Sequence, residues 1–223
     1  MASATINVVL RTPALTLDRN NGVVAYGTTV TFTAALGVTS TNRVVEIWTE
    51  DHETHYNQLL KRATVNSAGK VTASLKMTRN TTVTAKFSGD AGYAARTVKS
   101  IVYAKVKVKT ELRGHYKTKK VGSTKYSVFR KKVKPKIYVS MTANYPARHH
   151  RIVLQRYSGG KWRVFSDNYF PLSVQGYSSL RLTGNHPVGS KWRIRSEYTR
   201  GRSGDSFNYT TTEATWQYLT FSK

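Results

Sequence analysis

The run Thr28-Thr29-Val30-Thr31-Phe32-Thr33-Ala34-Ala35-Leu36 alternates apolar with mostly polar residues. Because successive side chains of an extended chain point to opposite faces, the apolar positions share one face: Val30, Phe32, Ala34 and Leu36. Threonine, valine and phenylalanine are also residues that favour strands. The run therefore predicts a β-strand with one face in a hydrophobic core.

Further strands are predicted on either side of this run. Asn20-Asn21-Gly22 and Tyr26-Gly27 supply turns before it, and Arg43 to Trp48 follows as a central strand whose Trp48 we expect in the core. No helical period persists for three turns. Short strands separated by turn residues predict an all-β sandwich. The other strands expected in this half are residues 5–10, 59–65, 70–77, 81–88 and 96–108.

The first half of the chain resembles the bacterial immunoglobulin-like repeat domains of secreted and cell-surface proteins of Gram-positive bacteria. The resemblance rests on three segments and covers nearly all of residues 10–108: Thr16 to Phe32 with its Tyr26-Gly27 pair, Ser67 to Val71, and Arg79 to Ala95. It implies a fold and no particular activity, since such modules are mostly spacers, adhesive units or carbohydrate-binding accessories. In the last segment Gly89 tolerates positive φ and Asp90 favours a turn.

The second half looks like a diverged copy of the first. Arg151 to Arg156 echoes Arg43 to Trp48 at an offset of 108 residues, and Gly176 follows Gly69 at an offset of 107. Ser203-Gly204-Asp205 repeats Ser88-Gly89-Asp90 at an offset of 115. We therefore predict two tandem immunoglobulin-like β-sandwich domains, residues 1–108 and 109–223. The strands expected in the copy are 136–143, 161–165, 177–182, 191–198 and 210–221, with a hairpin at 157–162.

Positive charge is concentrated in the second half. The chain has 36 Lys and Arg against 11 Asp and Glu; residues 1–104 have a net charge of +5 (11 − 6) and residues 105–223 one of +20 (25 − 5). Such density destabilises a compact state through repulsion, so an anionic partner is expected. Residues 105–136 hold 13 of these cations, and the alternating Lys105, Lys107 and Lys109 fit either a polymer contact or the solvated face of a strand.

A cluster further along this segment is harder to explain as a strand face, since three adjacent cations cannot all point to one side. We expect its residues to contact the polymer: Arg130, Lys131, Lys132, Lys134 and Lys136. Basic and aromatic residues also interleave at 156–157, 161–163, 191–195 and 198–202, a combination suited to phosphate polymers and sugars. We expect Trp162 and Trp192 to point into the core, in which case the alternate cations line the outer face. The additional contacts expected here are Arg193, Arg195, Arg200 and Arg202.

Two clusters contain groups able to bind a metal or a proton. Residues 50–55, Glu-Asp-His-Glu-Thr-His, match no established metal-binding spacing, so a turn or a protein-docking loop is the preferred interpretation. His149-His150 is expected to lie in a solvated turn after Tyr145-Pro146. The chain has no cysteine and no recognisable catalytic or nucleotide-binding motif. We expect no metal, no cofactor and no enzymatic activity.

These observations lead to one preferred function and two alternatives. The preferred function is a secreted, possibly cell-wall-associated binding or adhesion protein whose basic second domain attaches to an anionic cell-wall polymer or acidic glycan. The first alternative is a structural adaptor or stalk in a larger secreted assembly, such as an adhesin or antibacterial toxin particle, with other secreted proteins as partners. The second is nucleic-acid binding. The start Met1-Ala2-Ser3 resembles what remains after a signal peptide is removed, and no apolar run is long enough for membrane insertion.

Overall fold

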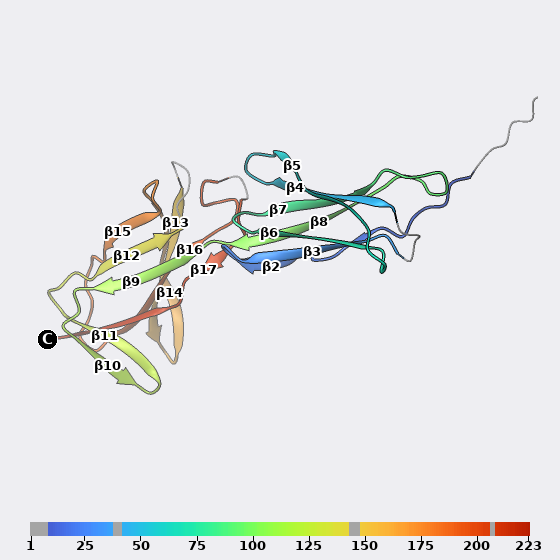
Figure 1. Ribbon diagram of the computed structural model, residues 1–223. Coiled ribbons are helices and arrows are strands. Elements are labelled where there is room, and N and C mark those ends of the chain that lie inside the picture. The colour runs from blue at the N-terminus through green and yellow to red at the C-terminus, as the bar shows by residue number, and fades with distance from the viewer. Residues whose placement is uncertain (1–8, 38–41, 143–147, 206–207) are drawn as a thin grey trace, which may run out of the picture. The chain divides into compact units, whose positions relative to one another are not determined.

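The computed structural model describes residues 9–37, 42–142, 148–205 and 208–223 (Figure 1). Within these residues the chain is all-β, with 18 strands and no helix, so the predicted fold class of immunoglobulin-like sandwiches is confirmed. The chain divides into two compact units, Met1–Ala104 and Lys105–Lys223. This division lies four residues before the boundary expected from the sequence.

The first unit consists of two facing sheets. One sheet has the order β1-β3-β6, and its strands are Thr16–Leu17, Thr29–Ala35 and Lys70–Lys76. The other has the order β2-β8-β7-β4-β5, and its strands are Gly22–Ala25, Arg96–Lys105, Thr81–Phe87, Val44–Asp51 and Asn57–Thr64. Phe32, Ile47 and Val83 are fully buried between the sheets. The predicted inward face of the β3 run is therefore confirmed.

Trp48 does not belong to this core, contrary to the expectation from the sequence. In β4 the buried positions are Val45, Ile47 and Thr49, so Trp48 points to the outer face. There its indole N–H donates to Glu46 Oε2 at 2.8 Å, and Lys86 Nζ lies 4.8 Å from the ring centroid. The direction of Trp48 is decided by the alternation of inward and outward side chains along β4, and not by the size of the tryptophan ring.

The second unit is also a sandwich. Its smaller sheet has the order β15-β12-β9, and its strands are Tyr177–Arg181, Lys136–Met141 and Val108–Arg113. Its larger sheet has the order β10-β11-β18-β16-β13-β14, and β17, Thr212–Glu213, pairs with β16. Those six strands are Lys117–Val121, Thr124–Arg130, Gln217–Ser222, Lys191–Tyr198, His149–Ser158 and Lys161–Pro171.

The core of the second unit confirms one part of the alternation argument. Trp192 and Ile194 of β16 are fully buried, as are Leu219 of β18 and Phe129 of β11. Trp162 is only half-buried and belongs to the other face of the larger sheet, because it pairs with Tyr157. Trp192 thus points inward as expected, and Trp162 does not.

The strand orders of the two units correspond element by element. The order β1-β3-β6 matches β9-β12-β15, and β2-β8-β7-β4-β5 matches β11-β18-β16-β13-β14. The glycine anchors also correspond: the Leu36 N–H donates to the Gly69 carbonyl oxygen at 2.8 Å, and the Met141 N–H to that of Gly176 at 2.7 Å. Among the described residues of the first unit, no strand corresponds to β10. The second unit is therefore the first topology with an added hairpin strand.

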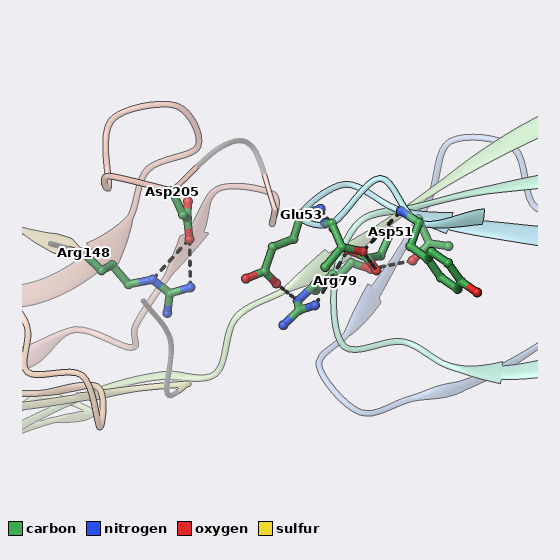
Figure 2. Close-up of polar contacts among 8 residues, drawn as sticks. Asp51, Glu53, Arg79, Arg148 and Asp205 are labelled. Atoms are coloured by element: carbon green, nitrogen blue, oxygen red, sulfur yellow. Dashed lines mark hydrogen bonds and ion pairs between the residues drawn. The ribbon is translucent and has the colours of Figure 1, made fainter. Parts of the chain in front are cut away.

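An ion pair at equivalent places corrects one detail of the sequence comparison. Arg43 lies directly before β4, and its Nε lies 2.5 Å from Asp90 Oδ2. Arg148 lies directly before β13, and its Nη2 lies 2.8 Å from Asp205 Oδ2 (Figure 2). Arg148, at an offset of 105, is thus the structural equivalent of Arg43. The sequence comparison aligned Arg43 with Arg151, at an offset of 108, and this alignment is wrong by three residues.

Some strand limits also differ from those expected. The predicted strand 96–108 is two strands, because β8 ends at Lys105 and β9 begins at Val108 in the other sheet. The predicted strand 210–221 is likewise divided into β17 and β18. The hairpin expected at 157–162 is confirmed, with Tyr157 paired to Trp162. Most of the predicted strand 5–10 lies outside the residues that the structure describes.

Candidate polymer-binding surface

The outer face of the larger sheet in the second unit gathers cations and aromatic rings from six strands. Since Trp192, Ile194, Leu219 and Phe221 are buried, the alternate positions of β16 and β18 point outward. The register places Arg193 beside Tyr218, Lys191 beside Thr220, Lys119 beside Tyr126 and Lys117 beside Val128. We call this surface the basic face, and its residues are Lys117, Lys119, Tyr126, Arg130, Tyr157, Trp162, Lys191, Arg193, Trp216 and Tyr218.

Arg193 lies at the centre of the basic face. Its guanidinium carbon is 4.8 Å from the ring centroid of Trp162 and 4.2 Å from that of Trp216. Its Nε donates to Gln155 Oε1 at 2.7 Å, which fixes the plane of the group. Cation–π contacts of this kind stabilise by about 0.5 to 2 kcal/mol each. Arg193 is therefore held in place by aromatic rings and an amide, and none of these three contacts involves a carboxylate.

The rings of the basic face contact one another. Trp162 is 5.2 Å from Tyr157 and 5.8 Å from Tyr218 between ring centroids, and Tyr126 is 5.5 Å from Tyr218. Lys191 Nζ lies 5.5 Å from the Tyr157 centroid. Tyr126 is nearly buried beneath its neighbours, whereas Tyr157 is 40% exposed. Cations and partly exposed rings therefore form one continuous surface.

Arg195, another contact expected from the sequence, is already paired within the protein. Its Nη2 lies 2.7 Å from Glu197 Oε1 and 2.5 Å from Glu213 Oε1, and its guanidinium also lies over Trp216 at 4.3 Å. Glu197 is buried, and it also pairs with Arg151. The charge of Arg195 is thus offset locally, so this end of the face is close to neutral.

The cluster from Arg130 to Lys134 lies at the other end. Arg130 ends β11 with its guanidinium 4.9 Å from the Tyr116 ring, and the Tyr116 hydroxyl lies 2.9 Å from Ser222 Oγ. Lys131, Lys132 and Lys134 are exposed in the loop before β12. Across the described residues, no carboxylate lies within ion-pair distance of these four cations. Their charge is available to a partner.

The remaining expected contacts lie elsewhere in the unit. Lys136 begins β12 on the outer face of the smaller sheet, between Arg113 and Arg181. Arg200 and Arg202 lie in the turn that follows β16, where the Arg202 N–H donates to the Thr199 carbonyl oxygen at 3.0 Å. The nine expected residues therefore belong to three places: the basic face with its adjoining loop, the smaller sheet and the turn after β16.

Sequence reasoning missed several members of the basic face. Lys117 and Lys119 belong to the added strand β10; Trp216 lies directly before β18, and Tyr218 is its second residue. The signal that predicts this hairpin is a pair of alternating segments on either side of the glycine turn at Gly122. These segments are Lys117-Thr118-Lys119 and Tyr126-Ser127-Val128.

The acidic loop at residues 50–55 is a self-contained turn in the first unit. Asp51 Oδ1 accepts hydrogen bonds from the N–H groups of Glu53 and Thr54 at 2.9 and 2.8 Å. Arg79 pairs with Asp51 at 3.7 Å and also with Glu53 (Figure 2). Burial raises the pKa of Asp51, but hydrogen bonds from Thr54 and Glu53 outweigh it and leave the pKa below its usual value. Among the described residues, no group of three or more His, Cys, Asp or Glu side chains could hold a metal ion.

The His149-His150 pair is in a strand and not in the solvated turn expected, while Tyr145-Pro146 lies outside the described residues. His150 is fully buried, and its Nδ1 lies 3.1 Å from Ser196 Oγ. Burial, together with the neighbouring His149, lowers the pKa of His150 to about 4. His150 is therefore a neutral part of the core.

Comparison with known proteins assigns no family. No protein-family model and no curated protein sequence matches the chain. Among solved structures it is similar to a mutant of Salmonella alpha-2-macroglobulin, with a TM-score of 0.34 and 9% identity over 96% of this chain and 15% of that one. It is also similar to the BSP domain of a biofilm associated protein, with a TM-score of 0.26 and 11% identity over 95% of this chain and 29% of that one.

The chain thus spans less than a third of the length of either structure. The resemblance to one particular repeat family stays a prediction. None of the described segments forms a helix long and apolar enough to cross a membrane.

Proposed function

We propose that the protein is a secreted, non-enzymatic binding protein that attaches to an anionic polymer of the cell surface through the basic face and the adjoining loop at Lys131–Lys134. The observation that carries this proposal is the position of Arg193 between two tryptophan rings, on a face where Lys117, Lys119 and Lys191 also point outward. An aromatic ring can stack against the polymer while a neighbouring cation neutralises its charge. This combination suits a polymer with repeated phosphate or carboxylate groups.

The distribution of acidic side chains supports this proposal. The second unit has five carboxylates, and every one of them lies in an ion pair with an arginine or lysine of the same unit: Glu111, Asp167, Glu197, Asp205 and Glu213. The excess of 20 positive charges therefore has no internal carboxylate left to offset it. A polyanion that binds there relieves repulsion and also releases its own counterions.

The test is retention of the full chain on purified Gram-positive cell walls, before and after chemical removal of their anionic polymers. We expect retention on intact walls and its loss on stripped walls. The variant Lys117→Gln/Lys119→Gln/Lys191→Gln should bind at least tenfold more weakly. A matched control removes three lysines of the first unit instead, as Lys61→Gln/Lys70→Gln/Lys99→Gln, and should bind like the unmodified protein. Equal retention on both kinds of wall would disprove the proposal.

Salt dependence separates specific binding from general attraction between opposite charges. If the three lysines contact the polymer, the plot of log K against log salt concentration should be less steep in the triple variant, by about two to three in slope. The same titration with double-stranded DNA addresses the nucleic-acid alternative. Tighter binding to DNA than to the wall polymer at the same salt concentration would favour that alternative.

A further inference from the structure

The smaller sheet of the second unit has an outer face that the polymer-binding proposal does not use. Its three strands are in register, so nine outward side chains form three rows across the sheet. These rows are Arg181–Lys136–Arg113, Ser179–Tyr138–Glu111 and Tyr177–Ser140–Lys109. The positions between them, such as Ile137, Val139 and Leu112, are buried and belong to the core.

A groove of about 560 Å³ lies on this face. Its lining includes the side chains of Tyr138 and Tyr177 together with Ser140 and Ser179 between them. Tyr177 is 63% exposed, so one ring is open to a ligand. Tyr138 is half-buried and the guanidinium carbon of Arg113 lies 4.1 Å from its ring centroid. The volume falls within the range of small-molecule sites, about 300 to 1,000 Å³.

The groove has the chemistry of a sugar site. An aromatic ring provides an apolar surface for the C–H face of a pyranose, and serine hydroxyls both donate and accept hydrogen bonds to the ring hydroxyls. Glu111 adds a carboxylate acceptor, fixed by Lys109 Nζ at 2.5 Å and Arg113 Nη2 at 3.0 Å. Hydrogen bonds from Lys109 and then Arg113 hold the pKa of Glu111 below its usual value, so it remains a carboxylate.

A row of cations next to the groove selects among sugars, and one member of this row, Arg113, also lines the groove. Lys136 lies between Arg113 and Arg181 in the register, and all three side chains are exposed. Only Arg113 of the three has a carboxylate partner within ion-pair distance in the described residues, namely Glu111. Two neighbouring cations without such a partner favour an anionic substituent, and arginine binds a carboxylate in a two-pronged arrangement.

We propose that this face binds an acidic sugar chain, pyranose rings that carry carboxylates, with one ring stacked on Tyr177 in the groove and the carboxylate of the next ring directed to Lys136 and Arg181, two rows away in the register. The site is separate from the basic face, since it lies on the other sheet of the sandwich, and it stands whether or not the basic face binds a polymer. Serine hydroxyls of the groove orient the ring, and Glu111 accepts from its hydroxyl groups.

The probe is a digalacturonate disaccharide, too short to engage a whole face, titrated into the full chain by calorimetry. The second probe is the same disaccharide with both carboxylates reduced to alcohols. We expect saturable binding of the acidic form and at least tenfold weaker binding of the reduced form. The variants Tyr177→Ala and Lys136→Gln/Arg181→Gln should each weaken binding of the acidic form by at least tenfold. These side chains are exposed, so the melting temperature should stay within about 2 °C of the unmodified protein.

Matched controls place the effect in the groove. Tyr56→Ala replaces a tyrosine of the first unit that is 70% exposed, and Lys61→Gln/Lys99→Gln removes two exposed lysines of that unit; neither should change the affinity. The basic-face variant Lys117→Gln/Lys119→Gln/Lys191→Gln should also keep full affinity for the disaccharide. Equal affinity for the reduced form, the absence of saturable binding, or loss of binding in the basic-face variant with retention in Tyr177→Ala would each overturn the proposal. Since the wall-retention test uses different variants and a long polymer, either proposal can fail alone.

Discussion

Arg148 donates two hydrogen bonds to a single oxygen of Asp205, from Nε at 3.2 Å and from Nη2 at 2.8 Å, and both side chains are 1% exposed. Tyr198 also donates its hydroxyl to Asp205. Because burial and this carboxylate disfavour ionisation, the pKa of Tyr198 lies above its usual value. The pair connects the start of β13 to the turn after β16.

Arg148→Met should destabilise the second unit strongly, since it leaves the Asp205 carboxylate buried without its cation. We expect a loss of about 3 to 5 kcal/mol in the free energy of unfolding, measured by denaturant titration. The equivalent pair in the first unit is more exposed, at 15% for Arg43 and 33% for Asp90. Arg43→Met should therefore destabilise the first unit much less than Arg148→Met destabilises the second. Similar losses in both variants would mean that burial does not decide the strength of the pair.

Gly176→Ala should be more damaging than the same change at another glycine with positive φ. Gly176 has φ 81°, and a Cβ built there collides with the Met141 carbonyl oxygen. Gly160 has φ 75°, and a Cβ there meets no atom within 4 Å. Gly160→Ala should cost about 1 to 2 kcal/mol through backbone strain alone, and Gly176→Ala about 1 to 3 kcal/mol more through the steric clash. Equal melting temperatures for the two variants would contradict this account.

Neutralising the loop before β12 should leave folding intact while binding falls. Arg130→Gln/Lys131→Gln/Lys132→Gln/Lys134→Gln removes four exposed cations, and we expect a change in unfolding free energy of about 0.5 kcal/mol or less for the three lysines. Arg130 also loses its contact with Tyr116, which adds a cost of about 0.5 to 1 kcal/mol. Melting temperature and retention on cell walls would be measured together. A lower melting temperature with unaltered retention would show that these residues brace the unit.

Stability should fall in mild acid because of His150. Its pKa is about 4 in the folded protein and about 6.5 when unfolded, so the unfolded chain takes up the proton first as the pH falls. The stabilisation is complete above pH 6.5 and is lost progressively towards pH 4, by about 3 kcal/mol for this shift. His150→Gln should remove this part of the pH dependence in denaturant titrations at pH 4.5 and 7. An unchanged pH dependence in the variant would assign the effect to other groups.

The fold could be predicted from the sequence because strand alternation reports burial directly. The run of β3 shows this, as its apolar positions are all buried. Trp48 and Trp162 show the limit of the same argument. Whether a large ring points inward depends on the phase of its strand, and the phase of β4 is set by Val45 and Ile47. Size alone was therefore a poor guide.

The candidate site could be predicted only in part. Arg193 was expected as a contact from its place between aromatic residues, and it does lie on a basic and aromatic face. Arg195, two residues on, has the same pattern but contacts Glu197 and the distant Glu213. Pairing of residues far apart in the sequence follows from the register of neighbouring strands, which a local charge pattern does not contain.

The added strand β10 gives the basic face a second property. It pairs with β11 and forms the edge of the larger sheet within the described residues, and Lys117, Lys119 and Lys120 make up three of its five positions. Lysines on an edge strand prevent it from pairing with the edge of another molecule, because their charges repel a second copy. A polyanion that neutralises Lys117 and Lys119 removes that repulsion. As more protein binds to the polymer, self-association of the protein along the polymer should therefore also increase.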